Sequence, residues 1–345
     1  MTDKTCSACS GLFLSTPDRR PVIACGNGDT ICAKCFDIRR QGGKKCPSCG
    51  EDLLGEYIVN KSLLNIIEHS SSLDISADQL EIEKQSIGGG AFGKVYNARW
   101  RKEDVVVKVI KHGYKSKDEV LVAKLEANIT IDLHHPNVVQ VFGTTWVKGK
   151  YLGIVMEKAE HGSLDKWIGK IDDETTAKIA LGIVDGLEYV HSRKVIHRDI
   201  KPTNILMFGA TEDMTPKIAD FGVSKLIEGV MLHTGYVGQN LYMAPEVKSC
   251  REYGFTADIF SLAVMLFEVF SGQSLSQASD EVKRFVGAVG GGKMADEIPN
   301  GRQLPACLRG VIKRGWAQNH TRRPELSEYR TALTSVIQEI NNDKN

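Results

Sequence analysis

The chain has 345 residues, of which 42% are hydrophobic and 25% are charged, and its formal net charge at pH 7 is +1. These values exclude a chain that is disordered throughout or a collagen-like fibre, and the length predicts about two domains. The balanced charge argues against a strongly basic nucleic-acid binder. The longest near-continuous apolar run, Ile259–Phe267, is far shorter than the ~20 residues of a membrane span. The N-terminus has no apolar run typical of a secretory signal. We therefore expect a cytoplasmic protein, or a nuclear one, with neither membrane nor nucleic acid among its partners.

Seven of the nine cysteines lie before residue 50, as three C-x-x-C pairs and one single residue. In a chain without signs of secretion, thiolates at this spacing are typical of zinc ligands. Two tetrahedral sites need eight ligands, and Asp29 is the one strong zinc donor between Cys25 and Cys32. The candidate ligands for two zinc ions are Cys6, Cys9, Cys25, Asp29, Cys32, Cys35, Cys46 and Cys49. Alternatively, Asp29 is a turn residue, and water or a neighbouring group is the eighth ligand.

The spacing C-x2-C-x15-C-x3-D-x2-C-x2-C-x10-C-x2-C resembles the RING finger family, in which the position of Asp29 is usually His. The resemblance implies that Cys6, Cys9, Cys32 and Cys35 hold one zinc ion, and that Cys25, Asp29, Cys46 and Cys49 hold the other. It also implies a ubiquitin-conjugating enzyme as a partner. Pro47 matches the contact surface of the family, whereas Ala8 and Gly50 depart from it. A zinc-dependent interaction module or a RING-mediated dimer is therefore the alternative to ligase activity.

We expect three regions along the chain. Residues 1–55 form the RING-type zinc finger, because about 50 residues bury too little apolar surface for a core without metal. Residues 56–78 form a short helix and a linker, since Leu63, Ile66 and Ile67 have helical spacing and a serine run at 70–72 interrupts it. The remaining residues, 79–342, are numerous enough for two packed lobes.

The segment Ile87–Val95 contains the pattern G-x-G-x-x-G-x-V. Glycine allows the backbone to approach phosphates closely. A dinucleotide-binding fold requires a helix directly after the glycines, but Val95–Trp100 and Asp104–Ile110 have the composition of strands. This order resembles the Gly-rich loop of protein kinases. The candidate nucleotide contacts in this loop are Ile87, Gly88, Gly89, Gly90, Gly93 and Val95.

Lys108 stands among four valines in the second of these strands. By the same resemblance it pairs with the phosphates of ATP. The alternative is a lysine that protects the edge of a sheet from aggregation.

His197–Asn204 matches H-R-D-x-x-x-x-N, and Asp220 opens an Asp-Phe-Gly triplet. On these motifs the chain resembles the eukaryotic protein kinase superfamily over about residues 80–340. The resemblance implies an α+β, two-lobed kinase fold, with a β-rich N-lobe over about 79–156 and a helical C-lobe over about 160–342. It implies ATP and magnesium as cofactors and proteins as substrates. Asp199 then accepts the proton of a substrate hydroxyl, and Asn204 and Asp220 bind magnesium.

Further residues take roles by the same resemblance. Lys201 is typical of serine/threonine kinases, and the sequence around Met156–Leu164 favours their tyrosine-kinase-like branch. Glu126, in a helix expected over Ser116–Leu133, holds Lys108, with Glu119 as the alternative. Met156 lies behind the adenine, and the backbone of Glu157 and Ala159 binds it. Gln239 replaces a threonine that usually supports peptide docking, so substrate selection is left open.

Two structural roles also follow from the resemblance. Glu246 pairs with Arg323, or with the adjacent Arg322. Asp258, which opens an apolar helix expected over Ile259–Phe270, holds the backbone of the catalytic loop, the segment that contains His197–Asn204.

The sequence thus favours an ATP-dependent serine/threonine protein kinase with an N-terminal RING finger and a second activity as a ubiquitin ligase. The alternatives are a RING ligase whose kinase-like domain recruits substrates, and a signalling scaffold. The joint presence of Lys108, Asp199, Asn204 and Asp220 favours an active kinase.

Overall fold

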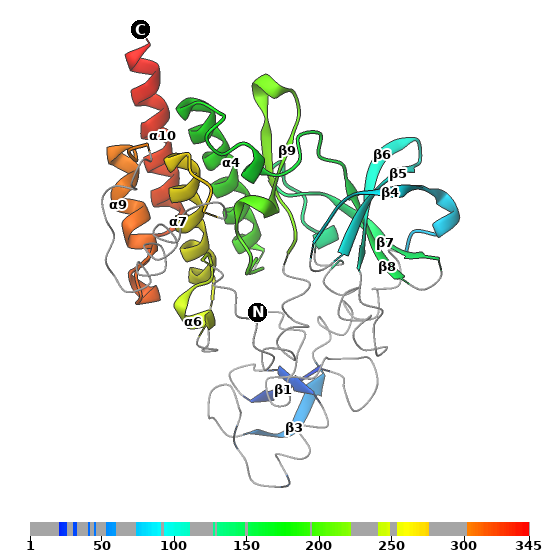
Figure 1. Cartoon of the computed structure of the whole chain (residues 1–345). Coiled ribbons are helices and arrows are strands. Elements are labelled where there is room, and N and C mark those ends of the chain that lie inside the picture. Colours follow the sequence, from blue (N-terminus) through cyan, green and yellow to red (C-terminus); the bar gives the residue numbers. More distant parts are fainter. Residues whose placement is uncertain are drawn as a thin grey trace. The chain divides into compact units, whose positions relative to one another are not determined.

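The protein is described by a computed structural model (Figure 1), in which two compact units comprise residues 1–131 with 141–155, and 132–140 with 156–345. The described residues are 21–25, 30–32, 41, 45, 53–59, 74–90, 93–110, 127, 130–148, 151–193, 195–221, 241–248, 254–275 and 302–344. Within these ranges, no helix combines the length and the apolar character that a membrane span requires.

A small antiparallel sheet lies in the cysteine-rich region. Its strands are β1 (Pro21–Cys25), β2 (Thr30–Cys32) and β3 (Leu53–Val59), in the order β2-β1-β3. Cys25 is the last residue of β1 and pairs with Leu53, and Cys32 is the last residue of β2 and pairs with Pro21. The other candidate zinc ligands, the expected helix near residue 65 and the serine run at 70–72 lie outside the described residues.

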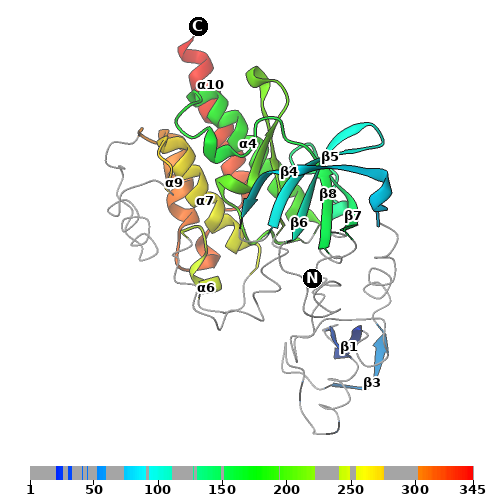
Figure 2. The same ribbon diagram turned by 45° about the vertical axis from the view of Figure 1, so that its right-hand side comes forward.

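A five-stranded sheet forms the N-lobe, in the order β4-β5-β6-β8-β7 (Figure 2). Its strands are β4 (Leu80–Gly90), β5 (Gly93–Trp100), β6 (Glu103–Ile110), β7 (Val141–Val147) and β8 (Tyr151–Glu157). Both strands expected after the glycine pattern are confirmed, because β5 follows β4 directly as an antiparallel hairpin and β6 pairs antiparallel with β5. The core of this lobe contains Ile75, Leu80, Ala98, Val105, Val107 and Val155.

The segment before β4 is attached to β7. The amide of Ile75 donates to the carbonyl of Thr144 at 2.7 Å, and the Thr144 hydroxyl donates to Asp74 Oδ1 at 2.7 Å. The Ile75 side chain is buried in the core described above. A 3-10 turn, η2 (Ala77–Gln79), then leads into β4. The packing of the N-lobe therefore includes residues that precede its expected start at residue 79.

The helix expected over Ser116–Leu133 is described only at its C-terminal end. Ala127, Thr130 and Ile131 are helical, whereas Leu133 lies beyond the helix and is nonetheless buried. Pro136 follows closely, and proline disfavours helical backbone in the residue before it. Glu126 and Glu119 lie outside the described residues.

The C-lobe is mainly helical (Figure 1). Its helices are α4 (Asp173–Ser192), α6 (Pro245–Lys248), α7 (Thr256–Ser271), α9 (Ala306–Gly315) and α10 (Leu326–Asp343). Helix α4 begins where the Asp172 side chain accepts the amide of Thr175, which satisfies one of the free amides of the first turn. Helix α7 matches the apolar helix expected at Ile259–Phe270, and every residue from Ala257 to Ser271 is buried.

Short elements complete the C-lobe. Strands β9 (Ile205–Phe208) and β10 (Thr215–Ile218) form an antiparallel hairpin that encloses the turn η5 (Thr211–Asp213). The 3-10 turns η3 (Leu164–Lys166), η4 (Pro202–Asn204) and η6 (His320–Arg322) connect other elements. The expectation of a β-rich N-lobe and a helical C-lobe is confirmed.

Candidate active site

The glycine pattern lies on the β4–β5 hairpin. Gly88 pairs with Val95, Gly89 with Lys94, and Gly90 with Gly93. A β-carbon at Gly93 would lie 2.4 Å from the carbonyl oxygen of Val109, so only glycine fits where β5 passes β6. The side chain of Ile87 is 54% exposed, an unusual position for a large apolar residue. The hairpin thus combines close packing of Gly93 against β6 with an exposed apolar side chain, that of Ile87, which a ligand can bury.

Lys108 lies on β6 directly opposite Val95 of β5. Strand β6 is interior, because β5 flanks it on one side and β8 on the other. The alternative interpretation of Lys108 as an edge-strand residue is therefore wrong. Its side chain is half-buried, on a strand whose neighbouring residues Val105, Val106 and Val107 are buried.

The segment expected to receive adenine comprises the end of β8 and the residues directly after it. Met156 is buried, and Glu157 and Ala159 are half-buried. The amide of Glu157 donates to the carbonyl of Gln140 at 3.1 Å. Because this N–H group is already engaged, the backbone of Glu157 can contact adenine only through its carbonyl group.

The backbone of the catalytic loop is held by Asp258 at the start of α7. One carboxylate oxygen of Asp258 accepts the amide of His197 at 2.8 Å, and the other accepts the amide of Arg198 at 2.7 Å. The ring Nε2 of His191 lies 2.9 Å from the same carboxylate. Burial would raise the pKa of Asp258, but the hydrogen bond and charge of His191 and the amide of His197 lower it below its usual value. The expected role of Asp258 is thus confirmed.

His197 is buried, and its ring connects the catalytic loop to the residue that follows β10. Nε2 lies 2.9 Å from the carbonyl of Ala219, and Nδ1 accepts the amide of Asp199 at 3.2 Å. Burial lowers the pKa of His197. A neutral ring with its proton on Nε2 satisfies both contacts, so His197 fixes the loop without adding a charge.

The carboxylate of Asp199 is contacted by the side chains of Asn204 and Lys201. The amide nitrogen of Asn204 donates to Asp199 Oδ2 at 2.9 Å and to the Asp199 carbonyl at 2.8 Å. The ammonium group of Lys201 lies 2.7 Å from Oδ2. Since the Asn204 nitrogen faces Asp199, the amide oxygen is the atom of Asn204 that can ligate a cation.

Asp220 follows β10 and is exposed. Its backbone has φ 60°, and that of Arg198 has φ 72°, so both lie in the left-handed region that non-glycine residues rarely adopt. The amide of Ala219 donates to the carbonyl of Asn204 at 2.8 Å, which brings the residue before Asp220 against the end of the catalytic loop. Carboxylate and amide oxygens from Asp220 and Asn204 form a hard donor set suited to Mg²⁺.

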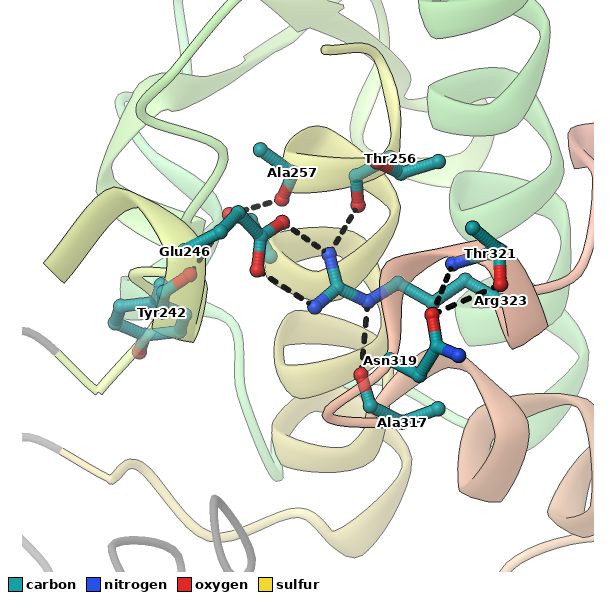
Figure 3. A network of polar contacts seen from close by, with 9 residues as sticks. Tyr242, Glu246, Thr256, Ala257, Ala317, Asn319, Thr321 and Arg323 are labelled. Atoms are coloured by element: carbon teal, nitrogen blue, oxygen red, sulfur yellow. Dashed lines mark hydrogen bonds and ion pairs between the residues drawn. The ribbon is translucent and has the colours of Figure 1, made fainter. Parts of the chain in front are cut away.

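Figure 3 shows the predicted ion pair of Glu246 and Arg323, which is confirmed. The alternative partner, Arg322, is exposed. Arg323 also donates to the carbonyls of Ala317 at 3.0 Å and Thr256 at 2.8 Å. It therefore joins α6, the start of α7 and the segment before α10 in one buried network.

Three contacts were not anticipated from the sequence: those of Lys217 with Glu157, of Tyr242 with Glu268, and of His191 with Asp258. The sequence could have indicated hydrogen-bond partners for Glu268, because it is a carboxylate between apolar residues of α7 and a buried carboxylate requires such partners. Lys217 and Glu157 are 60 residues apart, and neither has a local pattern that identifies the other.

Most of the predicted zinc ligands lie outside the described residues. In the ranges that the structure describes, no group of three or more His, Cys, Asp and Glu residues is placed to hold a metal ion. Six of the eight candidates lie outside those ranges, as do the side chains of Cys25 and Cys32 and the whole of Gln239.

Comparison with known proteins identifies the larger part of the chain. The model of the family described as protein kinase domain matches residues 82–333. The chain is 31% identical over 280 residues to the dual specificity protein kinase shkE of Dictyostelium discoideum, covering 78% of this chain and 38% of that protein. It is 30% identical to the serine/threonine-protein kinase STY17 of Arabidopsis thaliana (79% and 47%). It is 32% identical to the serine/threonine-protein kinase TNNI3K of Mus musculus (77% and 32%). The chain thus spans less than half the length of each of these relatives, and it belongs to the protein kinase domain family.

Proposed function

We propose that the chain is an ATP-dependent serine/threonine protein kinase that transfers the γ-phosphoryl group to a protein hydroxyl. The arrangement around Asp199 carries this proposal, because one carboxylate is held by Asn204 and by Lys201 in a loop whose backbone Asp258 fixes. The names of two relatives given above support the choice of serine and threonine, and the name of the third leaves tyrosine open.

Each group has one task in this proposal. Asp199 orients the substrate hydroxyl and accepts its proton, and Lys201 stabilises charge on the transferred group. Lys108, supported by Glu126, pairs with the phosphates, and the hairpin from Ile87 to Val95 covers them. Glu157 and Ala159 bind adenine through the backbone. Asn204 and Asp220 hold magnesium, which neutralises charge on the phosphates when bound.

Phosphotransfer from labelled ATP to generic protein substrates, followed by phosphoamino-acid analysis, tests the proposal. Asp199→Asn and Lys108→Met should each reduce the rate about 10²-fold or more. The matched controls are Asp213→Asn in the exposed turn η5 and Lys178→Met in an exposed ion pair with Glu174, and both should retain the rate. If Lys108→Met leaves phosphotransfer unchanged, the assigned site is wrong, and a recruiting or scaffolding role replaces it.

We further propose that the N-terminal region is a RING-type module with two zinc ions, and that it acts as a ubiquitin ligase in the cytoplasm or nucleus. The support is the spacing of seven cysteines and Asp29, together with the three-stranded sheet in which Cys25 and Cys32 end adjacent strands. Thiolate sulfur and carboxylate oxygen are both accepted zinc donors.

Metal analysis of the full chain should find two zinc ions, and Cys25→Ser should lose at least one. The matched control Cys307→Ser changes a free cysteine of the C-lobe and should lose none. Retention of two ions in Asp29→Ala would exclude Asp29 as a ligand. Discharge of ubiquitin from a panel of loaded conjugating enzymes then distinguishes a ligase from an interaction or dimerisation module.

A further inference from the structure

Glu157, the last residue of β8, and Lys217 on β10 form a partly buried ion pair within the second compact unit. Lys217 Nζ lies 2.6 Å from Glu157 Oε2, and each side chain is 20% exposed. The same ammonium group lies 4.5 Å from the centre of the Phe208 ring, a favourable position for a cation. Partial burial reduces screening by water and salt, so this pair is stronger than one on an open surface.

The other oxygen of the Glu157 carboxylate is also engaged. Oε1 accepts the amide of Gln140 at 2.7 Å, while the amide of Glu157 donates to the Gln140 carbonyl. The Gln140 side chain in turn lies 2.7 Å from Nδ1 of His134. Glu157 is therefore held through both carboxylate oxygens and its backbone.

Residues 137–139 form a second connection between β10 and the segment that contains Gln140. The amide of Ile218 donates to the carbonyl of Asn137 at 2.9 Å, and the amide of Val139 donates to the carbonyl of Ile218 at 2.9 Å. The Asn137 side chain also donates to the carbonyl of Pro216 at 2.9 Å. Strand β10 is thus fixed to Glu157 directly by Lys217 and indirectly through the segment that contains Gln140.

Strand β10 leads directly to Asp220, three residues after Lys217. We propose that the Glu157–Lys217 pair is a positioning pair, which sets the spacing between the adenine-binding backbone at Glu157 and the magnesium-binding carboxylate of Asp220. The inference rests on the nucleotide-binding roles proposed above. A ligand that touches both ends gains from this preset spacing, because its second contact then requires no further ordering of the protein. A ligand that touches only one end gains nothing from it.

Calorimetry with the full chain tests this distinction with two probes. MgATP reaches both ends, whereas adenosine reaches only the adenine-binding backbone. Lys217→Met should weaken MgATP binding about 5-fold, as expected for loss of about 1 kcal/mol, and adenosine binding less than about 2-fold. Lys217→Arg should retain wild-type binding of both, because it preserves the charge. Glu157→Gln provides a second variant, with the same expected selectivity, should Lys217→Met fail to fold.

Arg314→Met is the matched control, since it removes an exposed ion pair with Glu328 between α9 and α10. It should leave both affinities unchanged. Equal weakening of MgATP and adenosine, or no weakening of MgATP, would overturn the positioning role. Wild-type protein that binds neither probe would instead refute the proposed kinase function, and the inference with it.

Discussion

Arg323 and Glu246 form a bidentate ion pair. Nη1 of Arg323 lies 2.5 Å from Oε1 of Glu246, and Nη2 lies 2.9 Å from Oε2. Both side chains are buried. In such a pair the desolvation of two charges is offset only while both partners remain, so the loss of one leaves an uncompensated buried charge.

Arg323→Met should therefore lower the free energy of unfolding by about 3–5 kcal/mol, as measured by urea denaturation. Arg322→Met, at the exposed neighbour, should change it by less than about 0.5 kcal/mol. Burial would raise the pKa of Glu246, but Arg323 lowers it below its usual value. The stabilisation is therefore present above the unfolded pKa of 4.5 and is lost as the pH falls below it. Similar losses in the two variants would contradict the assignment.

Glu268 should make stability fall as the pH rises. Its carboxylate accepts the Tyr242 hydroxyl, the Leu275 amide at 2.8 Å and the Ser274 side chain, and Asp165 lies nearby. Burial, aided by the charge of Asp165, raises the pKa of Glu268 from 4.5 to about 7. The stabilising contribution is thus complete below pH 4.5 and is lost as the pH rises through about 7.

Between these limits the wild type should lose about 3 kcal/mol relative to Glu268→Gln. Denaturation curves for both proteins from pH 5 to 8 give the difference. A difference that stays constant over this range would show that Glu268 keeps one protonation state.

The turn between β5 and β6 should be improved by glycine. Arg101 and Lys102 form this two-residue turn, with φ values of 51° and 71°. Such turns require left-handed backbone at both positions, and glycine adopts it without strain. Lys102→Gly should raise the free energy of unfolding by about 0.5–1 kcal/mol. Lys102→Ala retains the β-carbon and should give no gain in the same denaturation experiment.

Gly93 and Gly88 should respond differently to alanine. A β-carbon at Gly93 would approach the Val109 carbonyl too closely, whereas nothing lies within 4 Å of one at Gly88. Gly93→Ala should lower the free energy of unfolding by about 1–3 kcal/mol, because backbone must move to admit it. Gly88→Ala should change it by less than about 0.5 kcal/mol. Equal stability of the two variants would argue against the observed pairing of β5 with β6.

Short-range patterns predicted much of the fold and of the candidate site. The β4–β5 hairpin and helix α7 followed from glycine positions and an apolar run, because such features depend on neighbouring residues. The contact of Asp258 with the catalytic loop and that of Glu246 with Arg323 were expected from the kinase motifs.

Contacts between distant residues without a recognisable pattern were not predicted. Lys217 contacts Glu157 because β10 packs beside the segment that contains Gln140. The end of the helix at Ile131 was misplaced by two residues, since burial of Leu133 maintained the apolar periodicity beyond the helix itself. Tertiary packing therefore accounts for both differences.

The attachment of Asp74 and Ile75 to β7 determines where the chain can be truncated without loss of contacts in the N-lobe. A truncated protein that begins at residue 82, where the match to the kinase family starts, would lack Ile75 and Leu80 and would expose the apolar surface that they cover. It would also leave the buried hydroxyl of Thr144 without Asp74. Such a fragment is expected to aggregate, whereas one that begins at residue 74 keeps Ile75 and Leu80 in the N-lobe core and Asp74 beside Thr144.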